Sequence, residues 1–445
     1  MKKIIVLALI LTNFVTFAQS KNDNVLGAYS SKAIENAVIY EVNIRQYSPE
    51  GTFDAFTKDI PVLKKLGVKI LWLMPIHPIG VENRKEGLGS YYSVKDYRGV
   101  NPEFGKLANF QKLVKAAHKN GMYVILDWVP NHSAWDHSWV KAHPEYYAKD
   151  AAGKLISPFD WTDVVKFDYS NKNMRKAMVS DMNYWLTTAN VDGFRCDVAG
   201  EVPTDFWADA IKTLRKTRPA FLLAEAEKPE LLKNGFDMHY GWEEHHIMNG
   251  IAQGKKTVKD FDEYIKKMKQ TLEKDDVIMN MTSNHDENTW SGTEYERLAD
   301  AVEVFAAMTY CIPGMPLIYN GQEYDFNRRL KFFEKDQITK EKGKMFAIYE
   351  KLSHLKNKNE ALNGGKNAAT YKRLSTSNDE NILTFEREKN GKKIVFIANL
   401  SKTNQSFSSP VDGTYTDYMN AKKLTLKKGQ TTDFAPWEYK ILVML

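Results

Sequence analysis

Short apolar segments alternate with amphipathic ones over most of the chain. Each apolar segment is nearly continuous, a pattern typical of parallel strands that are buried on both faces. The predicted strands cover residues 38–43, 69–76, 122–129, 193–198, 220–226, 236–240, 277–283 and 315–320. Between them apolar residues recur at helical spacing, and the predicted helices include residues 54–67, 110–120, 173–190, 204–217 and 298–310.

This alternation of strand and helix, repeated about eight times, implies parallel strands joined by helical crossovers. It favours an α/β fold of the (β/α)8 TIM-barrel type over an open sheet, built from residues 19–355. The active site of such a barrel lies at the C-terminal ends of its strands. One connection between strands does not follow this alternation, because residues 132–167 are rich in aromatics but lack a helical period. We therefore predict a small subdomain inserted after the third strand.

The pattern changes after residue 355. Residues 356–445 contain short alternating segments, and Asn390-Gly391 between two of them is a hairpin signal. This predicts a C-terminal antiparallel β-sandwich domain. We expect it to cover the flank of the barrel, and a separate sugar-binding role is the alternative.

The first residues indicate export. Lys2 and Lys3 precede an apolar run that ends at Phe17, and Ala18 is a small residue suited to cleavage. We predict that residues 1–18 are a signal peptide and that the mature protein is periplasmic or extracellular. A membrane anchor is the alternative, although the run is short for a span of ~20 residues. We expect no membrane span elsewhere.

The charge of the chain bears on its binding partners, and the position of its cysteines bears on disulfide formation. The formal net charge is +6, without long basic runs, which argues against a nucleic-acid partner. The two cysteines, Cys196 and Cys311, lie in apolar segments. We expect buried free thiols, with a disulfide as the alternative that an exported protein allows.

Acidic residues stand at the ends of four predicted strands: Asp127, Asp197, Glu225 and Asp286. Arg195 and Asp197 are two residues apart and so point to the same side of a strand. A guanidinium beside Asp197 should lower the pKa of that carboxyl, as a carboxylate nucleophile requires. Acidic strand ends can also be simple helix caps, but caps do not explain four of them at corresponding places on one barrel.

These segments resemble the signature regions of the α-amylase family of glycoside hydrolases (family 13). Asp127-Trp128-Val129-Pro130-Asn131-His132 fits the pattern D-x-V-x-N-H, and Gly193-Phe194-Arg195-Cys196-Asp197 fits G-x-R-x-D. The segments ending at Glu225 and at His285-Asp286 resemble the other two regions. Residues 89–105 and 166–171 resemble two further motifs of the family, and the likeness spans about residues 38–350.

The resemblance implies a role for each matching residue. Asp197 would be the nucleophile, Glu225 the general acid and base, and Asp286 a stabiliser of the oxocarbenium-like sugar. Arg195 would orient Asp197, and Asp127 would support Arg195 from beneath. The implied contacts with the reacting glucose come from Tyr92, His132 and His285. A nucleophile and an acid ~5–5.5 Å apart imply retention of the anomeric configuration.

The residues after the nucleophile depart from the family pattern, and this departure bears on both the calcium site and the reducing-side subsite. Asn131 matches one usual calcium ligand, so a structural Ca²⁺ is possible, while the chemistry itself requires no cofactor. After the nucleophile the chain reads Val198-Ala199-Gly200-Glu201 in place of the usual Lys-His pair. This resembles the neopullulanase and cyclomaltodextrinase branch, and Glu201 would take over the reducing-side contact. The large N-terminal domain of that branch is absent here, so we expect a monomer.

The sequence thus predicts an exported retaining hydrolase of α-1,4-glucosidic bonds in starch-like glucans or maltooligosaccharides. The alternatives within the family are a cyclomaltodextrinase or neopullulanase, a glucanotransferase and an α-1,6 debranching enzyme; residues 81–88 and the inserted subdomain should decide among them. An inactive glucan-binding protein is the alternative from another class, although Asp197, Glu225 and Asp286 are all present. An aldolase-like barrel would need a Schiff-base lysine at a strand end, and none is evident.

Overall fold

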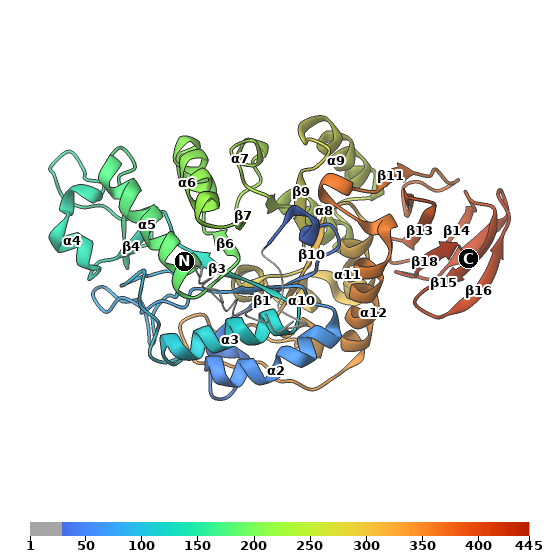
Figure 1. Cartoon of the computed structure of the whole chain (residues 1–445). Helices are drawn as coiled ribbons and strands as arrows, with labels where there is room; N and C mark the ends of the chain where they lie inside the picture. The colour runs from blue at the N-terminus through green and yellow to red at the C-terminus, as the bar shows by residue number, and fades with distance from the viewer. Residues whose placement is uncertain (1–28, 445) are drawn as a thin grey trace, which may run out of the picture.

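Eight parallel strands close into a barrel in the computed structural model, which describes residues 29–444 (Figure 1). The strands are β1 (Ile39–Val42), β2 (Ile70–Leu73), β3 (Tyr123–Trp128), β6 (Gly193–Cys196), β7 (Phe221–Ala224), β8 (Met238–Tyr240), β9 (Val277–Asn280) and β10 (Met315–Tyr319). They follow one another around the ring in chain order, and β10 closes it against β1. The predicted (β/α)8 barrel is confirmed. The predicted signal peptide lies outside the described residues.

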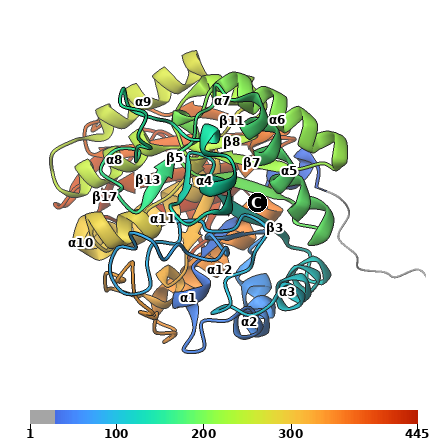
Figure 2. The ribbon, with the colours of Figure 1, turned by 90° about the vertical axis from the view of Figure 1, so that its left-hand side faces the viewer.

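Helices cover the outside of the barrel (Figure 2). The longer ones are α2 (Phe53–Leu66), α3 (Leu107–Lys119), α5 (Lys172–Thr188), α6 (Thr204–Thr217), α8 (Trp242–Ala252), α9 (Val258–Thr271), α11 (Val302–Cys311) and α12 (Lys344–Lys358). The shorter ones are α1 (Ile44–Tyr47), α4 (Ser138–Ala142), α7 (Pro229–Lys233) and α10 (Glu294–Leu298). Their apolar faces pack on the strands and form the main hydrophobic core.

The alternation of side chains along each strand builds the site. Inside the barrel, Ile39, Ile125 and Leu223 belong to one apolar cluster. The residue two positions further along each strand points the same way, toward the C-terminal end of the barrel. In β1, β3 and after β7 that residue is Glu41, Asp127 and Glu225 respectively. A polar layer therefore caps an apolar barrel interior, at the end where the active site was expected.

A segment between β3 and α5 stands apart from the barrel. It contains a two-stranded sheet of β4 (His132–Ala134) and β5 (Val164–Lys166), with α4 between them. The segment lies on the opposite side of the barrel from the C-terminal domain (Figures 1 and 2). It lies in the stretch where the sequence predicted an inserted subdomain.

The C-terminal domain is antiparallel. Its larger sheet has the strand order β11-β12-β13-β18-β15-β16, and β14 pairs with β17. The strands are β11 (Thr370–Arg373), β12 (Ile382–Lys389), β13 (Lys392–Asn399), β14 (Gln405–Ser408), β15 (Gly413–Asp417), β16 (Lys422–Leu426), β17 (Thr431–Phe434) and β18 (Tyr439–Met444). Phe407 and Phe434 of the small sheet share an apolar cluster with Val395 and Leu442 of the large one. The prediction of an antiparallel β-sandwich is confirmed.

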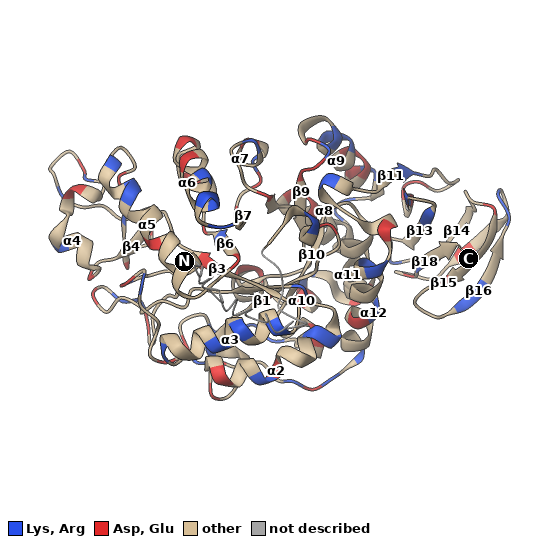
Figure 3. Cartoon of the chain, viewed as in Figure 1, with Lys and Arg blue, Asp and Glu red and all other residues tan. Residues whose placement is uncertain are grey.

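Acidic and basic side chains are interspersed on α6 and α9 (Figure 3). Among residues 29–444, no helix is long and apolar enough to cross a membrane. Cys196 and Cys311 are buried free thiols, as predicted.

Candidate active site

Arg195 lies at the centre of the polar layer. Its side chain on β6 is fully buried. Nη1 contacts Asp127 Oδ1 at 2.9 Å and Asp197 Oδ1 at 3.0 Å, and Nη2 contacts Glu225 Oε1 at 2.8 Å. Three of the four predicted acidic strand ends therefore meet on one guanidinium, which fixes the positions of two carboxylates that reach the cavity above it.

Asp127 lies beneath this cavity and does not line it. Its second carboxylate oxygen accepts hydrogen bonds from Trp72 Nε1 and from the Tyr92 hydroxyl, both at 3.1 Å. The Arg195 guanidinium lies over the Trp72 ring, 5.0 Å from its centroid. Asp127, Trp72 and Tyr92 thus hold the guanidinium from below and from the side.

The expected lowering of the Asp197 pKa is wrong. Burial raises the pKa of Asp197, and the nearby Glu225 carboxylate raises it further, against the opposing effect of Arg195. Burial also raises the pKa of Asp127 to about 6. The physical reason is that one guanidinium faces three carboxylates, so it cannot neutralise all of them in a low-dielectric site. The cluster accordingly favours retaining a proton.

The turn after β6 is strained. Val198 has a φ of +36°, which is unusual for a β-branched residue and costs of order 1–3 kcal/mol. The Asp197 N–H donates to the Trp128 carbonyl at 2.8 Å, and the Val198 N–H donates to Glu225 Oε2 at 2.6 Å. The strained turn therefore places Asp197 and directs a backbone donor at Glu225.

His285 and Asp286 follow β9. His285 is buried; its Nε2 lies 2.8 Å from the Tyr92 hydroxyl and 3.4 Å from Asp286 Oδ2, and its Nδ1 pairs with Glu41. Burial acts to lower the pKa of His285, but the Asp286 and Glu41 carboxylates raise it to about 9. His285 is therefore a buried cation at neutral pH, with both ring nitrogens as donors.

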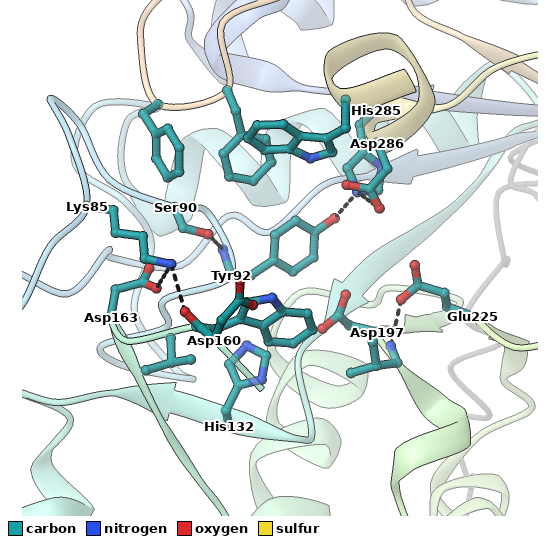
Figure 4. Close-up of a pocket in the computed structure, with 16 residues that line it drawn as sticks. Lys85, Ser90, Tyr92, His132, Asp160, Asp163, Asp197, Glu225, His285 and Asp286 are labelled. Carbon is teal, nitrogen blue, oxygen red and sulfur yellow. Dashed lines mark hydrogen bonds and ion pairs between the residues drawn. The ribbon is translucent and has the colours of Figure 1, made fainter. Parts of the chain in front are cut away.

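A cavity of about 430 Å³ opens above these groups (Figure 4). Asp197, Glu225, His285 and Asp286 line one part of it. The remaining lining residues are Lys85, Ser90, Tyr92, His132, Asp160, Trp161, Asp163, Val164, Val198, Trp290, Phe332 and Phe333. Burial lowers the pKa of His132 to about 3, so its imidazole is neutral and can both donate and accept a hydrogen bond.

Besides Asp127 and Arg195, which lie beneath the cavity, two further predicted residues do not line it. Glu201 is exposed and does not line it, so its subsite role stays a prediction. Asn131 is buried, and its Nδ2 lies 3.2 Å from His132 Nδ1. No group of three or more His, Cys, Asp or Glu side chains within residues 29–444 is arranged to hold a metal ion. Asn131 therefore lacks a carboxylate cluster around it, and calcium binding stays a prediction.

Sequence reasoning missed several residues of the site. Glu41 could have been identified from the sequence, because it is a lone carboxylate within the apolar first strand. Lys85 and Asp163 contact each other across the cavity end, and Trp161, Phe332 and Phe333 line it. These residues come from loops that are distant in sequence, and no local pattern indicates which of them meet.

Comparisons with known proteins agree with this geometry. The family profile described as "Alpha amylase, catalytic domain" matches residues 14–163, and the one described as "Alpha amylase, C-terminal all-beta domain" matches residues 375–437.

Similar proteins span this chain to different extents. The Alpha-amylase MalA of Haloarcula japonica is 27% identical over 304 residues, 65% of this chain and 44% of that protein. The Maltogenic alpha-amylase of Bacillus acidopullulyticus is 26% identical, over 88% of this chain and 70% of that protein. The structure of a noncanonic maltogenic alpha-amylase, AmyB from Thermotoga neapolitana, has a TM-score of 0.85 and 29% identity, covering 93% of this chain and 99% of that one. The closed barrel, the C-terminal β domain and both profile matches together identify an α-amylase catalytic domain and an α-amylase C-terminal domain (glycoside hydrolase family 13) in this chain.

Proposed function

We propose that the protein is a retaining hydrolase of α-1,4-glucosidic bonds in maltooligosaccharides and starch-like glucans. The observation that carries this proposal is the pairing of Asp197 and Glu225 with the two ends of one guanidinium, at the mouth of an aromatic-lined cavity. Both carboxyls face the same small space. This favours the ~5–5.5 Å spacing of a retaining enzyme over the wider spacing that an inverting enzyme needs for its water.

The first step forms a covalent intermediate. The Asp197 carboxylate attacks the anomeric carbon of the bound glucose while the bond from that carbon to the leaving 4-oxygen breaks. Glu225 gives its proton to the leaving oxygen. This step needs one proton and one negative charge on neighbouring carboxyl groups at the same time. The carboxyl cluster on Arg195 suits this need, because one guanidinium faces several carboxyl groups. Asp286 and protonated His285 contact the sugar as positive charge develops on its ring.

The second step releases the product. Glu225, now a carboxylate, takes a proton from water, whose oxygen attacks the anomeric carbon. The ester bond to Asp197 breaks and the carboxylate is restored. Tyr92 supports this step as a flat surface beneath the reacting sugar, beside His285, with which it stacks at 5.5 Å between ring centroids.

The test is a product time course on maltoheptaose, soluble starch, cyclodextrin and pullulan, with the Asp197→Asn variant beside the native protein. We expect release of maltooligosaccharides with the α-anomer formed first by NMR, and an activity loss in the variant of about 10⁴-fold or more. Glucan binding without cleavage by the native protein would favour an inactive binding protein. The relative rates on cyclodextrin and pullulan distinguish the cyclomaltodextrinase and neopullulanase alternative. The similarity to the Cyclomaltodextrinase of Thermoanaerobacter pseudethanolicus, 25% identical over 83% of this chain, supports that alternative.

We also propose that the protein is exported, since residues 1–18 have the charge and hydrophobicity of a signal peptide. N-terminal sequencing of the mature protein should begin at Gln19. Osmotic-shock fractionation distinguishes the periplasm from the medium, and sedimentation velocity tests the expected monomer. A calcium titration followed by thermal unfolding tests whether Asn131 belongs to a calcium site.

A further inference from the structure

We propose that one end of the cavity is closed by the loop of residues 81–89, so that the enzyme acts on the non-reducing end of a glucan and releases a short saccharide of fixed length. The inference rests on the proposed function, and it names which end of the substrate the site selects.

The closed end is the glycone end. Glu225 protonates the leaving oxygen, so the part of the substrate that departs lies on the Glu225 side of Asp197. The part that stays bound to Asp197 lies on the other side, toward Tyr92. Lys85 and Asp163 stand at the end of the cavity opposite Glu225 (Figure 4). In an α-1,4-glucan this direction leads to the non-reducing terminus.

The loop 81–89 spans this end from one wall to the other. On one side Lys85 Nζ lies 3.6 Å from Asp163 Oδ1 and donates to the Asp160 carbonyl at 3.4 Å, which ties the loop to the inserted segment. On the other side the Leu88 N–H donates to the Phe333 carbonyl at 2.8 Å, which ties it to the loop after β10. The three segments form a continuous wall where an endo-acting enzyme needs an open groove.

The loop is held in place by further bonds. The Arg84 guanidinium donates to the Gly80 carbonyl at 2.7 Å and to the Ile79 carbonyl at 3.3 Å. The Val81 N–H donates to Asp136 Oδ2 of the inserted segment at 3.1 Å. These contacts fix both the start and the middle of the loop, so a longer glycone cannot pass simply by displacing a free chain segment.

The chemistry of the closed end suits a terminal sugar. Trp161, Phe332 and Phe333 offer apolar ring faces to the sugar rings, and the end itself carries the Lys85 ammonium and the Asp163 carboxylate. A terminal glucose has a free 4-hydroxyl that can hydrogen-bond to these groups, whereas an internal glucose has a glycosidic bond there. A site that hydrogen-bonds a hydroxyl discriminates strongly against a substrate that lacks it.

The test compares two chromogenic maltoheptaosides, one with a free non-reducing end and one whose terminal 4- and 6-hydroxyls carry an ethylidene bridge. We expect the native protein to cleave the free substrate with a kcat/KM at least about tenfold above that for the blocked one. Lys85→Ala removes part of the wall and should bring this ratio toward one, and Lys85→Arg should restore it.

Lys112→Ala is the matched control, since Lys112 also pairs with an aspartate, Asp54 at 3.2 Å, but neither residue lines the cavity or bonds to the loop 81–89. It should leave the ratio unchanged. The labelled fragments from early cleavage of the free substrate should be of one predominant length. Equal rates on both substrates, or an early ladder of labelled fragments, would overturn the inference while leaving the hydrolase proposal intact. Absence of cleavage of either substrate would overturn the hydrolase proposal and this inference with it.

Discussion

The mouth of the barrel and its junction with the C-terminal domain each bury two cations, but in opposite surroundings. At the mouth, Arg195 and His285 face carboxylates. At the junction, Arg387 and Lys356 face backbone carbonyls. All four side chains are almost completely buried. The two regions therefore place the same kind of group, at similar burial, against different partners.

The junction cations bridge several segments. Arg387 on β12 donates to the carbonyls of Cys311 at 2.9 Å, Asn363 at 3.1 Å and Thr370 at 2.8 Å. Lys356 on α12 lies in the same region and donates to two carbonyls, those of Gly314 at 2.8 Å and Leu362 at 2.6 Å.

The partners decide the sign of the pKa shift. Burial lowers the pKa of Arg387 to about 10, and burial together with the nearby Arg387 lowers that of Lys356 to about 7. At the mouth, burial acts in the same direction, but Asp127 and Glu225 raise the pKa of Arg195 above its ordinary value. Against carbonyl dipoles the burial of the charge dominates the pKa shift, whereas nearby carboxylates outweigh it. The junction cations thus bridge backbone segments, while the mouth cations hold carboxylates at the cavity.

The largest effect should come from Arg195→Met. Removing the guanidinium leaves Asp127, Asp197 and Glu225 as a buried cluster without a counter-charge. We expect kcat/KM to fall by at least about 10³-fold and the free energy of unfolding to fall by about 3 kcal/mol. Steady-state kinetics and urea unfolding measure the two losses.

Arg195→Lys serves as the control for charge without geometry. A lysine supplies one point charge and cannot bridge two carboxylates in the manner of a guanidinium. It should recover part of the stability but little of the activity. Near-native activity in Arg195→Lys would show that the shared guanidinium is not what positions Asp197 and Glu225.

The next effect should come from Arg387→Met, which leaves three carbonyls at the junction without this donor. We expect the free energy of unfolding to fall by about 2 kcal/mol, with kcat/KM on maltooligosaccharides unchanged. Limited proteolysis should cut faster within residues 359–370, between the end of α12 and β11. A loss of activity as large as that of Arg195→Met would contradict the division between the two regions.

The sequence predicted the mouth better than the junction, for physical reasons. The barrel and the positions of Asp197 and Glu225 follow from strand periodicity, which is a local signal. The charge state of Asp197 does not, because it depends on three carboxylates from three strands converging on Arg195. The contact of Lys85 with Asp163 and the docking of Arg387 on Cys311 join segments far apart in the chain, and neither carries a local pattern.

Lys356→Met should change how the free energy of unfolding depends on pH. The pKa of Lys356 is about 7 in the folded protein and about 10.4 when unfolded. Between these values the unfolded chain binds more protons, so folding becomes more favourable as the pH rises. Relative to the methionine variant, the native protein should gain stability from pH 7 upward, by at most about 1.4 kcal/mol per pH unit. Urea unfolding from pH 6 to 9 measures this gain, and parallel curves for the two proteins would contradict it.

The smallest effect should come from Glu41→Gln, at the other buried cation of the mouth. Glu41 raises the pKa of His285, which is about 9 in the native protein. Glutamine keeps an acceptor for Nδ1 but removes the charge, so the pKa of His285 should fall, by about one unit. Protonated His285 lies against Tyr92 and Asp286 at the cavity, so if this cation supports the proposed reaction, kcat/KM should decline at a correspondingly lower alkaline pH than in the native protein. NMR titration of the ring, assigned with His285→Gln, links that decline to His285. An unchanged pKa of His285 in Glu41→Gln would show that Asp286 alone keeps His285 protonated. Glu41 would then serve only to orient the His285 ring.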